Sequence, residues 1–126
     1  MFASAQSLID AANAAVLRIS PDEARALVDT QDALVLDVRD PGEIALSGKL
    51  SGALNIPHGE VPFRADPASP HHLAAFRKDR PVILYCASGR RSALDGHVLK
   101  RLGYDQVYNL GGFRDGADAG WAVEAG

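Results

Sequence analysis

Val-Ile-Leu-Tyr-Cys-Ala-Ser-Gly-Arg-Arg-Ser-Ala occupies residues 82–93 and runs on to Leu102-Gly103. Residues 82–85 are an uninterrupted apolar and aromatic run, which is typical of a parallel strand covered on both faces. After a short loop, apolar residues recur at helical spacing and end at a glycine suited to a left-handed C-cap. The stretch therefore predicts a buried strand, a tight loop and a helix, with Cys86 where the strand ends.

The position of Cys86 predicts a nucleophile. The first N–H groups of a helix have no intrahelical partner and favour anions, and a nearby Arg lowers the pKa of a thiol further. Gly89 allows the loop to turn with a positive φ, and Arg90 and Arg91 add two cations. The alternative interpretation is an inert core thiol, because free cysteines are often buried. That interpretation leaves the sequence Ser-Gly-Arg-Arg-Ser after Cys86 unexplained.

These residues, together with four further motifs, resemble the single-domain rhodanese family. The motifs are Cys86-Ala87-Ser88-Gly89-Arg90-Arg91-Ser92, Asp37-Val38-Arg39-Asp40-Pro41-Gly42-Glu43, Gly52-Ala53-Leu54-Asn55-Ile56-Pro57, Leu102-Gly103-Tyr104 and Leu110-Gly111-Gly112-Phe113. The resemblance implies an α/β fold, a three-layer sandwich with a five-stranded parallel sheet and helices on both faces. Active members of the family carry sulfane sulfur as a persulfide on the loop cysteine, and this role falls on Cys86.

The resemblance also assigns the binding residues. It implies that the substrate is bound by Ala87, Ser88, Gly89, Arg90, Arg91 and Ser92. The family motif favours Arg91 as the structurally placed arginine and Arg90 as the one that faces the substrate. The chain departs from the family at Gly48-Lys49-Leu50, where Gly-His-Ile is usual, and at Gly116, where a tryptophan is often found.

Length and composition agree with one domain. The 126 residues are 47% hydrophobic and 23% charged, which is ordinary for a globular domain large enough to bury a core. The net charge of −3 gives no reason to expect nucleic acid as a partner. No segment has the length and hydropathy of a membrane span or the pattern of a signal peptide. One cysteine excludes an internal disulfide, so we expect a cytoplasmic protein.

The remaining strands and helices are predicted to alternate, which gives a parallel sheet. Strands are expected at 17–19, 33–38, 53–56 and 106–110. Helices are expected from Pro21 to about Asp29, from the Asp40-Pro41-Gly42-Glu43 start signal through Leu46, and at 71–76. Residues 61–70 are expected to be a connection that ends in a cap at Ser69. Ligands bind at the carboxyl ends of the strands in such sheets.

Residues 4–17 predict an amphipathic helix, capped by Ser4 or Ser7, outside the family core. We therefore divide the chain into an N-terminal helical extension, 1–17, and a rhodanese-like domain, 18–126. The helix either packs on the flank of the domain or mediates a dimer. The expected state is a monomer or a weak homodimer through this helix.

Other polar residues carry weaker signals. Asp37 and Arg39 lie at a strand end, as a rim of the site or as a structural ion pair. His71 and His72 are adjacent, so on a helix they point about 100° apart, and no third ligand accompanies them. We assign no role to His58. No metal and no cofactor are expected.

The sequence predicts a sulfurtransferase. Cys86 would take sulfur from thiosulfate or a related anionic donor. An external thiol, cyanide or a cysteine of a partner protein would accept it, because the chain has no second thiol. The alternatives are a non-catalytic interaction module and, in third place, a cysteine-dependent phosphatase or arsenate reductase. The phosphatase loop needs Arg at the sixth position after Cys, where this chain has Ser92.

Overall fold

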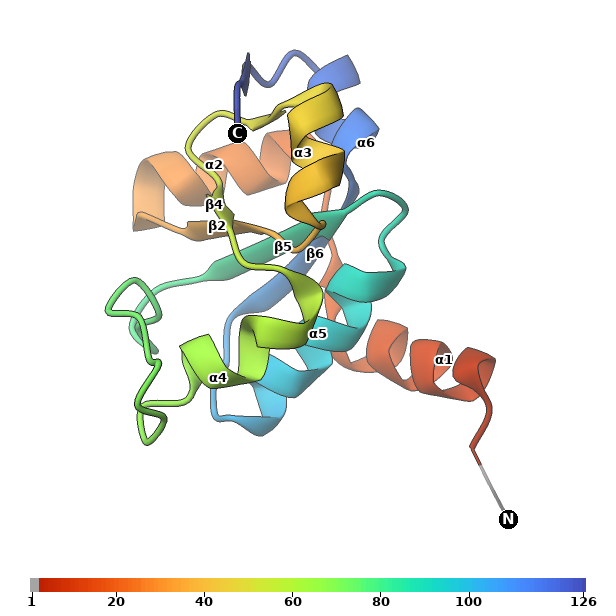
Figure 1. The fold of residues 1–126 in the computed structure, drawn as a ribbon, viewed down its shortest axis with the longest axis vertical. Coiled ribbons are helices and arrows are strands. Elements are labelled where there is room, and N and C mark those ends of the chain that lie inside the picture. The colour runs from red at the N-terminus through yellow and green to blue at the C-terminus, as the bar shows by residue number, and fades with distance from the viewer. Residues whose placement is uncertain (1–2) are drawn as a thin grey trace.

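Five parallel strands form the central sheet in the computed structural model, which describes residues 3–126 (Figure 1). The strands are β1 (Leu17–Arg18), β2 (Leu34–Asp37), β4 (Leu54–Asn55), β5 (Val82–Cys86) and β6 (Val107–Gly112). Their order is β1-β6-β5-β2-β4, and each neighbouring pair is parallel. All five predicted strands are present, and β5 is the central one.

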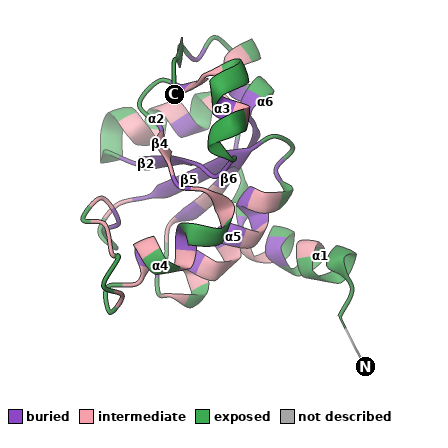
Figure 2. Cartoon of the chain, in the orientation of Figure 1, coloured by how far each residue is buried: buried purple, intermediate pink, exposed green. Residues whose placement is uncertain are grey.

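The sheet is buried on both faces. Every residue of β2 and β5 is buried, as their unbroken apolar runs predict (Figure 2). Side chains alternate along β5, so that Leu84 and Cys86 belong to one apolar cluster while Ile83 and Tyr85 belong to the other. The sulfur of Cys86 therefore lies on the face that also holds Leu99 of the following helix.

Helices form the two outer layers. They are α1 (Ala5–Ala15), α2 (Pro21–Gln31), α3 (Pro41–Ser47), α4 (Val61–Ala65), α5 (Arg90–Arg101) and α6 (Phe113–Asp118), with a 3-10 turn at His58–Glu60. Helices α1, α4 and α5 lie below the sheet in Figure 1, and α2 and α6 lie above it, with α3 beside them. This arrangement is the expected three-layer sandwich.

Local capping explains where several helices begin and end. Ser20 and Glu23 cap α2 reciprocally, with backbone-to-side-chain hydrogen bonds of 3.1 and 3.0 Å. Ser4 caps α1 by accepting the N–H of Ser7 at 3.0 Å. Gly103, predicted as a left-handed cap, follows α5 with φ +98°.

Two predictions between 61 and 76 are wrong. The predicted connection at 61–70 contains α4, because Pro62 lies in the first turn of a helix, where a missing N–H costs nothing. The predicted helix at 71–76 is a series of turns. Ser69 accepts the N–H of His71 at 3.1 Å, and the N–H of Leu73 donates to the Arg64 carbonyl at 2.9 Å. A segment of six residues gains too few helical hydrogen bonds to compete with these contacts.

The structure also contains a second, two-stranded sheet that the sequence did not predict. The short strands β3 (Lys49–Leu50) and β7 (Val123–Glu124) pair in antiparallel fashion, and the Lys49 ammonium contacts the Glu124 carboxylate at 2.7 Å. Leu50 also explains the departure at Gly116, because a Cβ at that glycine would lie 2.6 Å from Leu50 Cδ1. The chain thus places a leucine against the position where the family often has tryptophan.

Helix α1 packs against α5 rather than standing free. Ala12 and Val16 are buried, and a Cβ at Gly96 of α5 would lie 3.1 Å from the Val16 methyl groups. The division at residue 17 stays a prediction, and residues 1–2 lie outside the described part of the chain.

Candidate functional site

The candidate site is the loop between β5 and α5. Cys86 is the last residue of β5 and only 1% exposed, and three loop residues lead to Arg90, the first residue of α5. Gly89 caps the helix with φ +95°, the left-handed conformation predicted for it. This turn lets Gly89 point its N–H back toward the sulfur.

The sulfur of Cys86 accepts hydrogen bonds from its own loop. The Gly89 N–H lies 3.0 Å from Sγ, and the Ser92 hydroxyl lies 3.5 Å from it. Burial acts to raise the pKa of the thiol. Hydrogen bonds from the Ser92 hydroxyl and from the N–H groups of Ser92, Ser88 and Gly89 outweigh burial, so the pKa of Cys86 lies below its ordinary value. The loop thus favours the thiolate, the form of cysteine that attacks electrophiles.

Asn109 holds this loop against β6, and the sequence analysis missed it. Its Oδ1 accepts the Ser92 hydroxyl at 2.8 Å and the Gly111 N–H at 2.9 Å, and its Nδ2 donates to the Gly89 carbonyl at 3.0 Å. Asn109 is 1% exposed. The sequence did contain a signal for it: Asn109 lies inside a predicted buried strand, and a buried side-chain amide needs hydrogen-bond partners.

The two loop arginines have different surroundings. Arg91 is half-buried, and its terminal nitrogens contact the two carboxylate oxygens of Glu43 at 2.6 and 3.0 Å. This ion pair is the main reason that the pKa of Glu43 falls to about 2. Arg90 is exposed, and within residues 3–126 it makes no ion pair. Ala87 and Ser88 are exposed beside it, whereas Ser92 is buried.

Asp37 and Arg39 form a buried ion pair. Their closest contact is 2.7 Å, and their side chains are 0% and 4% exposed. Arg39 also donates to the Ser47 hydroxyl and the Gly48 carbonyl, both at 2.8 Å, and lies over the Phe113 ring. These contacts tie the end of β2 to the end of α3.

The buried Asp95 is paired with the partly exposed His58, a contact that the sequence did not indicate. His58 Nδ1 lies 2.8 Å from Asp95 Oδ1 on α5, and the Asp95 side chain is 4% exposed. The other oxygen of Asp95 is buried without a hydrogen-bond partner among the described residues. Burial is the main cause that raises the pKa of Asp95 to about 6, against the opposing effects of His58 and Arg91.

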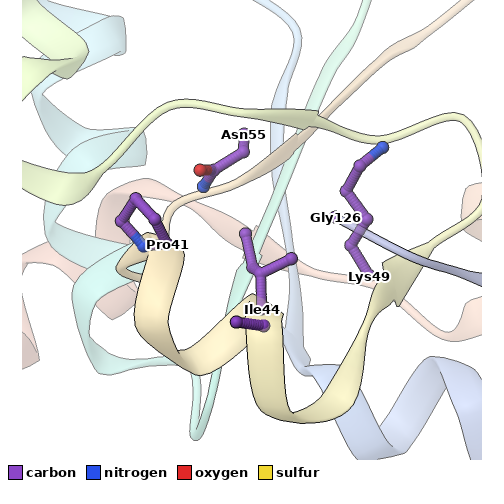
Figure 3. A pocket seen from close by; sticks show the side chains of 6 residues that line it. Pro41, Ile44, Lys49, Asn55 and Gly126 are labelled. Carbon is purple, nitrogen blue, oxygen red and sulfur yellow. The ribbon is translucent and has the colours of Figure 1, made fainter.

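A cavity of about 230 Å³ lies away from the loop, beside α3 and β4 (Figure 3). The residues that line it are Pro41, Ile44, Ala45, Lys49, Asn55 and Gly126. The Lys49 ammonium is already bonded to the Ala53 carbonyl at 2.6 Å and to Glu124. None of residues 86–92 lines this cavity, so Cys86 and the cavity are separate features.

Residues 3–126 contain no group of three or more His, Cys, Asp or Glu side chains that could hold a metal ion. No helix in the same part of the chain is both long enough and apolar enough to cross a membrane.

Comparison with known proteins supplies relatives for this fold and loop. A family model described as a rhodanese-like domain matches residues 20–119. A protein of Allochromatium vinosum named sulfurtransferase is 40% identical over 86 residues, which are 68% of this chain and 72% of that protein. The thiosulfate sulfurtransferase GlpE of Stutzerimonas stutzeri is 32% identical over 97 residues, or 76% of this chain and 80% of that protein.

A solved structure covers nearly the whole chain. A protein of unknown function from Rhodopseudomonas palustris, described as a possible tyrosine phosphatase, is similar with a TM-score of 0.87. It is 31% identical, and the match covers 98% of this chain and 96% of that one. The similarity therefore includes the N-terminal helix.

Proposed function

The chain belongs to the rhodanese-like domain family, and on that basis we propose that it is a sulfurtransferase that carries sulfane sulfur as a persulfide on Cys86. The observation that supports this proposal most is the hydrogen bond of 3.0 Å from the Gly89 N–H to Sγ. A loop that donates N–H groups to an anionic sulfur stabilises both the thiolate and the persulfide anion.

The first step loads the cysteine. The Cys86 thiolate attacks the outer sulfur of thiosulfate, a new S–S bond forms, and the S–S bond of thiosulfate breaks. Sulfite leaves with the electron pair, and the negative charge of the thiolate passes to the terminal sulfur of the persulfide. Arg90 is the exposed loop cation that would bind the sulfonate, because Arg91 is already paired with Glu43.

The second step unloads it. The chain has one cysteine, so the acceptor is external: a small thiol, cyanide or a cysteine of a partner protein. For a thiol, the deprotonated acceptor attacks the terminal sulfur, the S–S bond to Cys86 breaks, and Cys86 leaves as the thiolate. The acceptor thiol has lost its proton to solvent before the attack, the transferred sulfur leaves as the persulfide of the acceptor, and the loop returns to its starting state.

Mass spectrometry after incubation with thiosulfate tests the proposal. Wild-type protein is expected to gain the mass of one sulfur atom on Cys86 and to form thiocyanate when cyanide is added. Cys86→Ser is expected to do neither. A wild-type protein that gains no sulfur and forms no thiocyanate would contradict the proposal.

A cysteine-dependent phosphatase is the second candidate, favoured by the description of the Rhodopseudomonas palustris structure. Such a loop surrounds a tetrahedral oxyanion with an arginine at the sixth position after Cys, where this chain has the buried Ser92. Arg91, one position earlier, is bound to Glu43. Hydrolysis of an aryl phosphate that requires Cys86 and is faster than sulfur transfer would reverse this ranking.

The surroundings of the enzyme are also part of the proposal. We place it in the cytoplasm, where thiol acceptors are reduced, as a monomer or a weak homodimer. The N-terminal helix and the Lys49 region are the candidates for partner contacts if the domain is an interaction module. Retention of Cys86, Gly89 and Ser92 in one bonded loop supports the catalytic function instead.

A further inference from the structure

The Arg18 side chain packs against the backbone of Gly89 and Gly111, next to the Cys86 loop. It belongs to the edge strand β1, where it is paired in register with Asn109 of β6. A Cβ at Gly111 would collide with the Arg18 guanidinium, and a Cβ at Gly89 would lie 3.2 Å from Arg18 Nη1. The guanidinium therefore lies across two glycines, one of which donates its N–H to the sulfur.

This contact keeps a cation close to the reacting sulfur. Gly89 N is 3.0 Å from Sγ, and the bonds within Gly89 then limit the distance from Sγ to Arg18 Nη1 to about 9 Å. That distance is similar to the Debye length of about 8–10 Å at ordinary salt concentrations. Arg18 can therefore attract an anion that approaches Cys86.

Asp115 is the counter-ion of Arg18 in the same place. Its Oδ2 lies 3.6 Å from Arg18 Nη2 and accepts the Gly112 N–H at 2.8 Å. Both side chains are more than half exposed, at 57% and 54%, so their attraction is weak. Gly112 in turn approaches the Cys86 loop, because a Cβ there would lie 2.5 Å from the Ala87 carbonyl oxygen.

The hydrogen bonds of Asn109 fix the backbone on which the Arg18 guanidinium lies. Asn109 fixes Gly89 on one side and Gly111 on the other, so the surface under the guanidinium is rigid. Arg90 follows Gly89 directly and is also exposed. The rim next to the sulfur thus presents two solvent-accessible arginines, of which only Arg18 is in an ion pair within residues 3–126.

We propose that Arg18, by exchanging Asp115 for an incoming carboxylate, forms an anion subsite that selects small carboxylate-bearing thiols as sulfur acceptors. The proposal deepens the sulfurtransferase function, because it names the class of acceptor. A guanidinium binds a carboxylate through two parallel N–H donors, so a thiol with a carboxylate is held while its sulfur attacks the persulfide. A neutral thiol gains nothing from this subsite.

Alkylation of Cys86 tests the subsite without requiring sulfur transfer. Iodoacetate is an anion and iodoacetamide is neutral, so the ratio of their rates reports the charge near the sulfur and is independent of the thiolate fraction. At an ionic strength of about 0.01 M, where screening is weak, Arg18→Ala is expected to lower this ratio three- to tenfold. Arg18→Lys should stay within about twofold of wild type, because the charge is kept.

Two further variants serve as controls. Arg101→Ala removes an exposed arginine at the other end of α5 and should leave the ratio unchanged. Asp115→Asn removes the competing carboxylate and keeps an oxygen for the Gly112 N–H, so it should raise the ratio about two- to threefold. Circular dichroism and a melting curve of each variant confirm that the fold is retained.

Sulfur transfer from the loaded enzyme tests the choice of acceptor. Arg18→Ala should raise the KM for 3-mercaptopropionate three- to tenfold and leave the KM for 2-mercaptoethanol unchanged. A wild-type enzyme that transfers no sulfur, but shows the predicted alkylation ratios, would contradict the sulfurtransferase function and retain the subsite. An Arg18→Ala ratio equal to that of Arg101→Ala, or an Arg18→Lys ratio as low as that of Arg18→Ala, would overturn the subsite.

Discussion

Replacing Ser92 by Ala is expected to weaken the Cys86 nucleophile without disturbing its position. The Ser92 hydroxyl lies 3.5 Å from Sγ and 2.8 Å from Asn109 Oδ1, and it has one proton to donate. With a neutral thiol, the shorter contact takes that proton. With a thiolate, donation to the charged sulfur competes with donation to Asn109, so the hydroxyl contributes only the difference between the two bonds.

That difference sets the magnitude. A hydrogen bond to a charged group contributes about 1.5–3 kcal/mol and one between neutral groups about 0.5–1.5 kcal/mol, so the net stabilisation of the thiolate is about 1 kcal/mol. About 1.4 kcal/mol corresponds to a factor of ten, so Ser92→Ala should lower the alkylation rate at neutral pH about fivefold. The pKa of Cys86, which the intact loop holds below its ordinary value, should rise.

The assay is the rate of iodoacetamide alkylation of Cys86 as a function of pH. Ser88→Ala is the matched control, because Ser88 contributes its backbone N–H, which alanine retains, and its side chain is exposed. Its pH profile should match that of wild type. If Ser92→Ala reacted within twofold of Ser88→Ala at every pH, the hydroxyl would have no part in activating the sulfur. A wild-type midpoint at or above the ordinary value of about 8.5 would contradict activation by the loop as a whole.

Three further predictions concern the ion pairs and α1. Asp95→Asn should remove a pH dependence of stability, because burial raises the pKa of Asp95 from 3.8 to about 6. As pH rises between these values, the free energy of unfolding of wild type should fall by up to about 3 kcal/mol, and that of the variant should not. Urea unfolding at pH 4 and pH 7 measures the difference. Glu43→Gln should lower the free energy of unfolding by about 1 kcal/mol at pH 7. This effect should fade as pH falls from 4.5 toward about 2, because only the ionised form of Glu43 is stabilised by Arg91. Thermal unfolding across that range measures it. Deletion of residues 1–16 should retain sulfur loading but lower the melting temperature by several degrees, because the deletion removes Ala12 and Val16, which cover α5. Size-exclusion chromatography of the deletion variant shows whether self-association changes.

The sequence was sufficient to predict the site wherever the relevant signal lies within a few residues. A buried run, a cysteine, a glycine and a helix in succession predict the Cys86 loop, because each element is fixed by its own neighbours. The positive φ of Gly89 and the capping of α2 by Ser20 and Glu23 are local in the same sense, and the structure contains both.

Contacts between distant segments could not be predicted in this way. Arg91 and Glu43 are 48 residues apart, and Lys49 and Glu124 are 75 apart, so no spacing rule connects them. The strands β3 and β7 have two residues each, too few to show an alternating pattern. Glu43 accepts the N–H of Asp40, three residues away, at 3.1 Å, and this contact is local. Its pairing with Arg91 appears only in three dimensions.

The network around Asn109 suggests how the loop accommodates a change of charge on sulfur without moving. Asn109 Oδ1 accepts the Gly111 N–H as well as the Ser92 hydroxyl, so it keeps one partner when the hydroxyl turns to the sulfur. Its Nδ2 continues to hold the Gly89 carbonyl, and the peptide that donates to Sγ therefore stays in place. Rotation of one hydroxyl group can thus stabilise the thiolate and, in the proposed reaction, the persulfide anion. A site that needs so little rearrangement favours such charged states. The activation of Cys86 therefore depends on β6 as much as on its own loop.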